Sequence, residues 1–154
     1  MIRVQEQDFD IGHEVERIRA GDHGIGAIVT FTGTVRADSG PDALASMHLE
    51  HYPGMTENEL QRIETQAQDR WPLQASLIVH RYGTLFPGDN IVLVVTASKH
   101  RLDAFESAEF LMDYLKTNAP FWKKEKRVSG ENWVEERSSD QDSEKRWIKP
   151  RAAE

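Results

Sequence analysis

The segment Ile91-Val-Leu-Val-Val-Thr-Ala97, followed at once by Ser98-Lys-His-Arg101, constrains the fold more than any other part of the chain. A run of apolar and β-branched residues without polar alternation predicts a strand that is covered on both faces. Apolar residues then recur from Ala104 to Leu115 with helical spacing, and Pro120 ends that helix. Residues 98–101 are therefore expected where a buried strand meets the start of a helix.

The preceding segments supply neighbours for this strand. Residues 77–82 are apolar and β-branched, and turn residues 87–90 separate them from it, which predicts a central hairpin. Thr56 followed by Glu59 predicts a capping box, and apolar residues at helical spacing extend that helix to Pro72.

Further elements are expected closer to the N-terminus. Asp10 can cap a short helix that ends near Gly21. Apolar residues that alternate from Ile25 to Phe31 predict a strand with one buried face, and residues 43–52 predict a second strand.

A lysine-bearing hairpin is expected after the last long helix. Residues 122–128 and 132–137 flank a glycine-containing turn, and a short helix would follow up to Trp147. The order of elements, βαββαββα and then this hairpin, indicates an α+β fold with a largely antiparallel sheet. No repeat or linker divides the chain, so residues 1–147 are expected to form a single domain and residues 148–154 a flexible tail.

The composition excludes several classes of protein. The chain has 154 residues, with 19 Lys and Arg against 26 Asp and Glu, and a formal net charge of −7. Net acidity argues against a general nucleic-acid binder. Neither a signal peptide nor an apolar segment of the roughly 20 residues that span a membrane is evident, so a cytoplasmic location is expected. Cysteine is absent, so any sulfur used in chemistry must be imported.

The basic residues are unevenly distributed along the chain. All seven lysines lie at or beyond Lys99, and five basic residues against the single acid Glu125 fall within residues 116–127. Such a run is often a solvated face. Here Pro120, Phe121 and Trp122 interrupt it, so the lysines could line a partly apolar pocket in which a lysine can act as acid, base or nucleophile.

Arginine and histidine side chains indicate a site for an anion. His100 and Arg101 are expected at a helix N-terminus, where backbone N–H groups are unpaired, and Arg36 follows a strand just before a loop. A capping histidine and a solvated arginine are the alternatives. Since a helix places Arg101 roughly 24 Å from Lys116, a second chain or the folded-back hairpin must complete a site that uses both.

Two other motifs carry little weight. His48, Glu50 and His51 have the residue types of a metal site, but alternate residues of a strand face opposite sides, so no metal is expected. Gly24 and Gly26 lack the third glycine and the following helix of a dinucleotide-binding loop. The sequence therefore predicts neither a metal nor a cofactor.

The chain as a whole resembles the large, catalytic subunit of molybdopterin synthase. The resemblance extends from about residue 8 to Trp147, and the order and spacing of the matching segments carry it. These segments are Phe31-Thr-Gly-Thr-Val-Arg36, Leu49-Glu-His-Tyr-Pro-Gly-Met-Thr56, Arg70-Trp-Pro72, His80-Arg-Tyr-Gly83, Ser98-Lys-His-Arg101 and Asp113-Tyr-Leu-Lys-Thr-Asn-Ala-Pro-Phe-Trp-Lys-Lys-Glu125.

The resemblance implies an α/β hammerhead fold and a homodimer of large subunits at the core of a heterotetramer. A small ubiquitin-like subunit that ends in Gly-Gly would carry sulfur as a C-terminal thiocarboxylate. Two sulfurs would pass in turn to cyclic pyranopterin monophosphate and form the dithiolene of molybdopterin. A partner that brings the sulfur agrees with a chain that has no cysteine.

The resemblance also implies the site residues. Lys116 and Lys123 match the two lysines of the family's reaction centre, and several basic residues match positions that hold the anionic substrate. The residues expected to bind substrate are Arg36, His100, Arg101, Lys116, Lys123, Lys124 and Arg137.

Two other functions stay open from the residues alone. One is a non-catalytic module that binds the anionic tail of a partner in the lysine-rich segment. The other is a phosphate-ester hydrolase, against which the lack of paired carboxylates and metal ligands counts.

Overall fold

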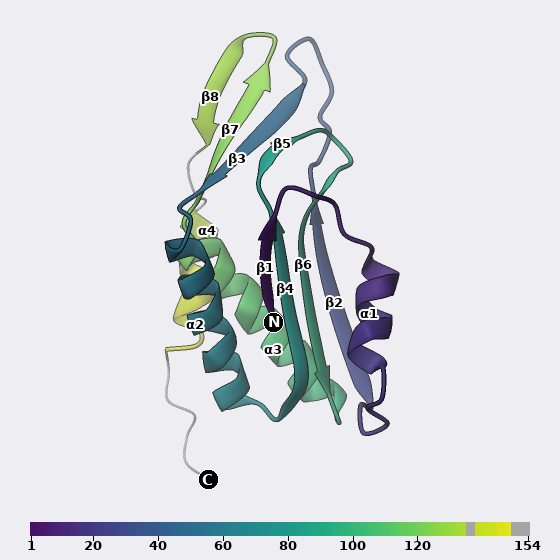
Figure 1. Cartoon of the computed structure of the whole chain (residues 1–154). Coiled ribbons are helices and arrows are strands. Elements are labelled where there is room, and N and C mark those ends of the chain that lie inside the picture. Colours follow the sequence, from purple (N-terminus) through teal and green to yellow (C-terminus); the bar gives the residue numbers. More distant parts are fainter. Residues whose placement is uncertain (135–137, 149–154) are drawn as a thin grey trace.

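A four-stranded sheet built around the predicted buried strand forms the main body of the protein. The computed structural model describes residues 1–134 and 138–148. Within them, strand β6 (Asn90–Ser98) lies between β4 (Leu73–Arg81) and β2 (Ala27–Thr34), antiparallel to both. Strand β1 (Ile2–Gln5) pairs in parallel with β4 at the other edge (Figure 1). The predicted central hairpin is therefore confirmed as β4 and β6.

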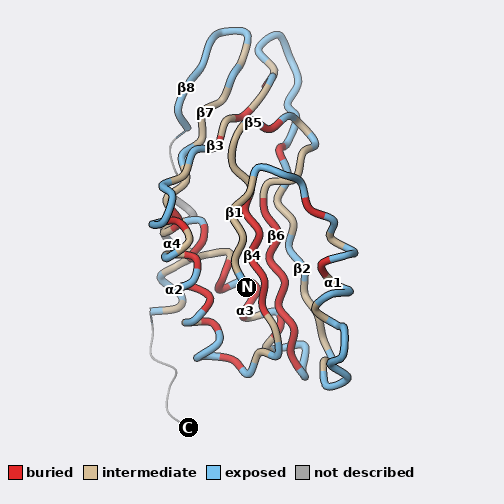
Figure 2. Tube along the Cα trace, in the orientation of Figure 1, coloured by how far each residue is buried: buried red, intermediate tan, exposed pale blue. Residues whose placement is uncertain are grey.

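Helices cover both faces of this first sheet. On one side lie α2 (Met55–Arg70) and α3 (Arg101–Asn118), and on the other side lies α1 (Ile11–Arg19). Alternate strand residues serve the two cores, because Val94 of β6 packs with the α2 and α3 side while Val95 packs with the α1 side. Figure 2 shows the buried residues concentrated along β4 and β6. The strand covered on both faces is confirmed.

A second four-stranded sheet lies beyond one end of the first (Figure 1). Its order is β5-β3-β7-β8, and all its pairs are antiparallel. The predicted hairpin, β7 and β8, thus pairs with β3 in a second sheet. The short β5, which follows β4 and precedes β6 in the sequence, was not predicted. The bounds are β3 (Ser46–His51), β5 (Gly83–Leu85), β7 (Phe121–Arg127), β8 (Gly130–Val134) and the last helix, α4 (Ser138–Lys145). The α+β class with largely antiparallel sheets is confirmed.

The start of α2 differs from the prediction. The helix begins at Met55 with Gly54 as its N-cap, and the backbone N–H of Gly54 donates to the carboxylate of Glu57 at 2.7 Å. Thr56 is inside the helix, and its hydroxyl donates to the Tyr52 carbonyl at 2.9 Å. The capping box over residues 56–59 is therefore wrong, because Gly54 turns the chain at φ +85° and starts the helix earlier.

Other expectations concern the chain ends. The carboxylate of Asp10 accepts a hydrogen bond from the His13 backbone N–H at 2.9 Å, which confirms the cap of α1. Arg137 and residues 149–154 of the expected tail lie outside the described residues.

Gly26 permits a close approach of two backbone segments. A Cβ added there would lie 2.3 Å from the carbonyl oxygen of Lys99. We expect Gly26→Ala to lower the free energy of unfolding by about 1–3 kcal/mol, because the backbone must shift to relieve the overlap. Urea unfolding measures this. Gly12→Ala in α1 is the control, since its added Cβ meets only the Asp10 carboxylate at 3.4 Å. Equal stability of the two variants would contradict the close approach.

Candidate active site

Lys116 and Lys123 come from two elements that meet at the junction of the two sheets. Lys116 is in the last turn of α3, and Lys123 is in β7 opposite the buried Leu49 of β3. The chain turns between them at Ala119 and Pro120, where α3 ends. Both ammonium groups lie near enough to His80 to lower the pKa of its ring. Two lysines that are separated in the sequence thus share one small region.

The imidazole of His80 lies near both lysines and is buried. Its Nδ1 is 2.8 Å from the carbonyl oxygen of Arg81, so Nδ1 carries the proton and donates. The ring stacks on Phe121 with 3.7 Å between centroids and 17° between planes. Burial lowers the pKa of His80 to about 3, and the positive charges of Lys123 and Lys116 act in the same direction. His80 is therefore neutral at physiological pH.

A group of aromatic rings continues from His80 along the second sheet. The ring of His51 lies 6.0 Å from that of Phe121 and 4.6 Å from that of Tyr82, between centroids. Sequence reasoning considered His51 only as a metal ligand and did not single out His80 or Tyr82 as individual site residues. A histidine directly after the apolar run Leu77-Ile-Val79 was the signal available for His80.

The other basic residues of the run do not join the lysine pair. Alternation along β7 places Lys124 on the opposite face of the sheet from Lys123, and its ammonium pairs with Glu131 at 2.8 Å. Arg127 forms ion pairs with Glu125 at 3.0 Å and Asp38 at 2.6 Å. Acids thus neutralise part of the local positive charge, and the structure does not bring Lys124 to the site of Lys116 and Lys123.

The predicted anion-binding residues lie at opposite ends of the first sheet. Arg36 is exposed just beyond the end of β2, near the start of β6. His100 and Arg101 are exposed at the other end of β6, where α3 begins. Since α3 is continuous from Arg101 to Asn118, Lys116 lies at its far end. The helix geometry predicted this separation, and one chain by itself does not bring His100 and Arg101 to Lys116.

The start of α3 has two notable surface properties. His100 occupies the N-cap position, but its side chain makes no capping hydrogen bond. The capping role that was the alternative for this histidine is therefore not seen. Leu102 and Phe105 in the first turns of the helix are 63% and 61% exposed. An exposed apolar surface thus adjoins His100 and Arg101.

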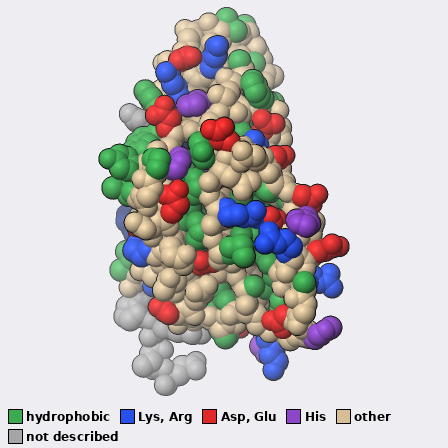
Figure 3. Space-filling view, viewed as in Figure 1, with side chains coloured by type: hydrophobic (Ala, Val, Ile, Leu, Met, Phe, Trp, Pro, Cys, Tyr) green, Lys and Arg blue, Asp and Glu red, His purple; other side chains and the backbone are tan. Residues whose placement is uncertain are grey.

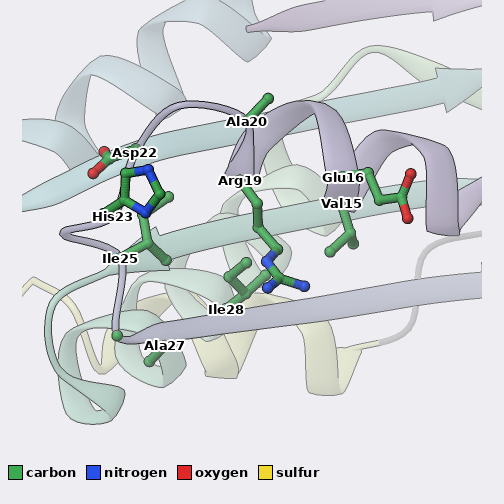
Figure 4. Close-up of a pocket in the computed structure, with 10 residues that line it drawn as sticks. Val15, Glu16, Arg19, Ala20, Asp22, His23, Ile25, Ala27 and Ile28 are labelled. Carbon is green, nitrogen blue, oxygen red and sulfur yellow. The ribbon is translucent and has the colours of Figure 1, made fainter.

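A separate cavity of about 840 Å³ lies between α1 and the beginning of β2. Figure 4 shows Arg19, Glu16 and His23 around it, with Ile28 on the β2 side. Of the predicted site residues that the structure describes, none lines this cavity.

Surface charge and metal-ligand geometry add further observations. On the face shown in Figure 3, Lys and Arg side chains are interspersed with Asp and Glu. Across the residues described, no cluster of three His, Cys, Asp or Glu side chains could hold a metal ion. His48 contacts Thr84 and lies 3.8 Å from the Glu50 carboxylate, and His51 contacts Thr56. In the same part of the chain, no helix is both long and apolar enough to cross a membrane.

The fold and the site define a class of protein. It is an α+β protein with two sheets, in which two lysines from different elements lie near the buried ring of His80 and suit an anionic ligand. Comparison with known proteins makes the assignment specific. The family model described as MoaE protein matches residues 4–118, and the chain belongs to this family.

Individual relatives are similar in sequence to this protein over almost its whole length. The molybdopterin synthase catalytic subunit of Brucella melitensis is 54% identical, and the match covers 99% of this chain and 94% of that one. The MoaE protein structure from Burkholderia ambifaria is 53% identical with a TM-score of 0.82, and covers 96% and 97% of the two chains. A Helicobacter pylori structure, a complex of subunits 1 and 2 of molybdopterin-converting factor, is 22% identical with a TM-score of 0.73. The match covers 89% of this chain and 92% of that one, and at this identity it shows the fold alone.

Proposed function

We propose that this chain is the catalytic subunit of a molybdopterin synthase. It transfers sulfur from the C-terminal thiocarboxylate of a small ubiquitin-like subunit to cyclic pyranopterin monophosphate, and so forms the dithiolene of molybdopterin. The observation that carries the proposal is the convergence of Lys116 and Lys123 beside the buried, neutral His80. The 54% identical relative with this activity in its name supports it.

The two lysines have different tasks in this proposal. Lys116, at the end of α3, moves protons or polarises the tail carbonyl while the thiocarboxylate attacks the substrate. Lys123 holds the tail and the negative charge that develops on the substrate. Because His80 is neutral, it adds no third positive charge near the two lysines.

The cationic residues outside this pair hold the substrate. Arg36, His100 and Arg101 bind the cyclic phosphate and the pterin, and Arg137 is a further candidate. Since Arg101 and Lys116 are at opposite ends of α3, a second copy of the chain supplies His100 and Arg101. The exposed Leu102 and Phe105 beside them are the apolar surface that this homodimer would cover.

A small partner subunit accompanies the homodimer in this proposal. The Helicobacter pylori structure of similar fold is a complex of two different subunits, which supports a partner of this kind. Its extended C-terminal tail would enter between Lys116 and Lys123, and two such subunits with two copies of this chain make a heterotetramer.

Reconstitution tests the proposed reaction. The purified protein is mixed with a thiocarboxylated small subunit and cyclic pyranopterin monophosphate, and the dithiolene product is measured. We expect product only when all three are present. A complex without product would indicate the non-catalytic binding module. Release of phosphate without the small subunit would indicate the hydrolase.

Mixing two inactive variants tests whether two chains share one site. Co-expression of Arg101→Ala with Lys116→Ala chains is expected to restore about one quarter of wild-type activity, since half of the randomly formed dimers contain one intact site. Co-expression of Lys116→Ala with Lys123→Ala is the control, because both changes damage the same half of the site. Failure of the first mixture to exceed the second would contradict a shared site.

A further inference from the structure

The C-terminal end of the described chain is attached to α3 by two adjacent residues. Arg146 donates to the carboxylates of Glu109 at 2.8 Å and Asp113 at 2.6 Å. The indole Nε1–H of Trp147 donates to the same Asp113 oxygen at 2.7 Å. We refer to Arg146 and Trp147 as the C-terminal clamp.

Packing fixes the position of this clamp. The ring of Trp147 makes edge contacts with Trp71 and Phe110, with 5.7 Å and 5.4 Å between centroids. Its carbonyl oxygen accepts a hydrogen bond from Arg70 at 3.1 Å. The two donors to Asp113 are thus held in place from α2 as well as from α3.

Asp113 is also the helix neighbour of Lys116. Residues three apart on a helix lie on the same face, where Asp and Lys attract each other and form ion pairs. Glu109, the other acid bound by the clamp, is a full turn further from Lys116. Among the described residues Lys116 has no ion pair, and the Asp113 carboxylate is 14% exposed and held by the clamp.

We infer that the C-terminal clamp is a positioning device for Lys116, an inference that rests on the catalytic role proposed above for that lysine. Arg146 and Trp147 bind the one carboxylate that could pair with Lys116 along the helix. The ammonium group of Lys116 is thereby left available to the substrate and the partner tail. Without the clamp, Asp113 would draw Lys116 back onto the surface of α3.

A rescue experiment separates this role from simple stabilisation. In the reconstituted reaction with saturating small subunit, Arg146→Gln is expected to lower kcat by about threefold to fivefold, the range of an added exposed ion pair. The double variant Arg146→Gln with Asp113→Asn should recover the wild-type rate, because it lacks the competing carboxylate. Glu109→Gln is the control and should act like wild type, since Arg146 and Trp147 still hold Asp113.

The rescue is informative because the single variant Arg146→Gln and the double variant both lack the contacts that Arg146 makes with residues 109 and 113. If the clamp only stabilised the fold, the double variant would be as slow as Arg146→Gln or slower, and this would overturn the inference. A wild-type rate for Arg146→Gln would overturn it as well. If Arg146→Gln does not fold, Trp147→Phe replaces it, since it removes the Nε1–H donor to Asp113 and keeps an aromatic ring beside Trp71 and Phe110.

A second measurement is independent of the proposed reaction. Trace acetylation followed by mass spectrometry compares the reactivity of Lys116 with that of the exposed Lys126 in each variant. We expect Lys116 to react about threefold to fivefold more slowly in Arg146→Gln, and to recover when Asp113 is also changed to Asn. Unchanged Lys116 reactivity would refute the clamp, whereas absence of product from wild type with the expected labelling pattern would refute the proposed function alone.

Discussion

Lys116→Ala is expected to lower the rate of molybdopterin formation by at least about 100-fold with the small subunit saturating, as loss of a positioned proton-transfer group does. Lys116 lies at the end of α3 beside the buried His80, and no ion pair within the described chain engages it. Its removal deletes the group that we propose to act on the tail carbonyl. Single-turnover formation of product measures the effect on the chemical step.

Lys126→Ala is the matched control for this variant. Lys126 is in β7 opposite Glu131 and lines the outer face of the second sheet with Lys124. The same loss of one positive charge there should leave the rate nearly unchanged. A loss of tenfold or less for Lys116→Ala, or equal losses for the two variants, would contradict the catalytic role.

The second large effect that we expect is a loss of folding stability at acidic pH, which arises from the buried His80. The pKa of its ring is about 3 in the folded chain against 6.5 in the unfolded chain. The unfolded chain therefore binds an extra proton between these values, and stability is lost as the pH falls from about 6.5 towards 3. The slope is about 1.4 kcal/mol per pH unit, which amounts to about 2–3 kcal/mol between pH 6.5 and 4.5.

His80→Phe tests this effect because it keeps an aromatic ring next to Phe121 and removes the titration. The charged or titratable groups that act on the His80 ring are Lys123 of β7, Lys116 of α3 and His51 of β3. Urea unfolding at pH 6.5 and 4.5 should show a smaller loss of stability in the variant by about 2–3 kcal/mol. His13→Gln, at an exposed histidine, should keep the wild-type loss. An unchanged acid loss in His80→Phe would show that His80 does not titrate in this range on unfolding.

The elements that local patterns determine were the predictable ones. The apolar run at 91–97 and the apolar stripe after it are present as β6 and α3, since burial on both faces and helical periodicity leave direct marks in a sequence. The division into two sheets was not predictable, because it depends on which distant strand β3 pairs with. The short β5 is too brief to leave a pattern.

The site could be predicted only in part for the same reason. The lysine run and the family resemblance pointed to Lys116 and Lys123. Which lysine faces which side of the second sheet depends on the strand register, and this places Lys124 with Glu131 instead. His80 was not predicted as a site residue, because its contact with Phe121 joins residues that are 41 positions apart in the sequence.

The position of the partner's tail tests the central claim most directly. It would be seen in a crystal structure of this protein with the small subunit bound. We expect the C-terminal carbonyl group of the tail within hydrogen-bond distance of Lys116 or Lys123, with Arg101 of a second copy facing the same pocket. A tail seated elsewhere, in the cavity between α1 and β2 or on the outer face beside Lys124, would contradict the account.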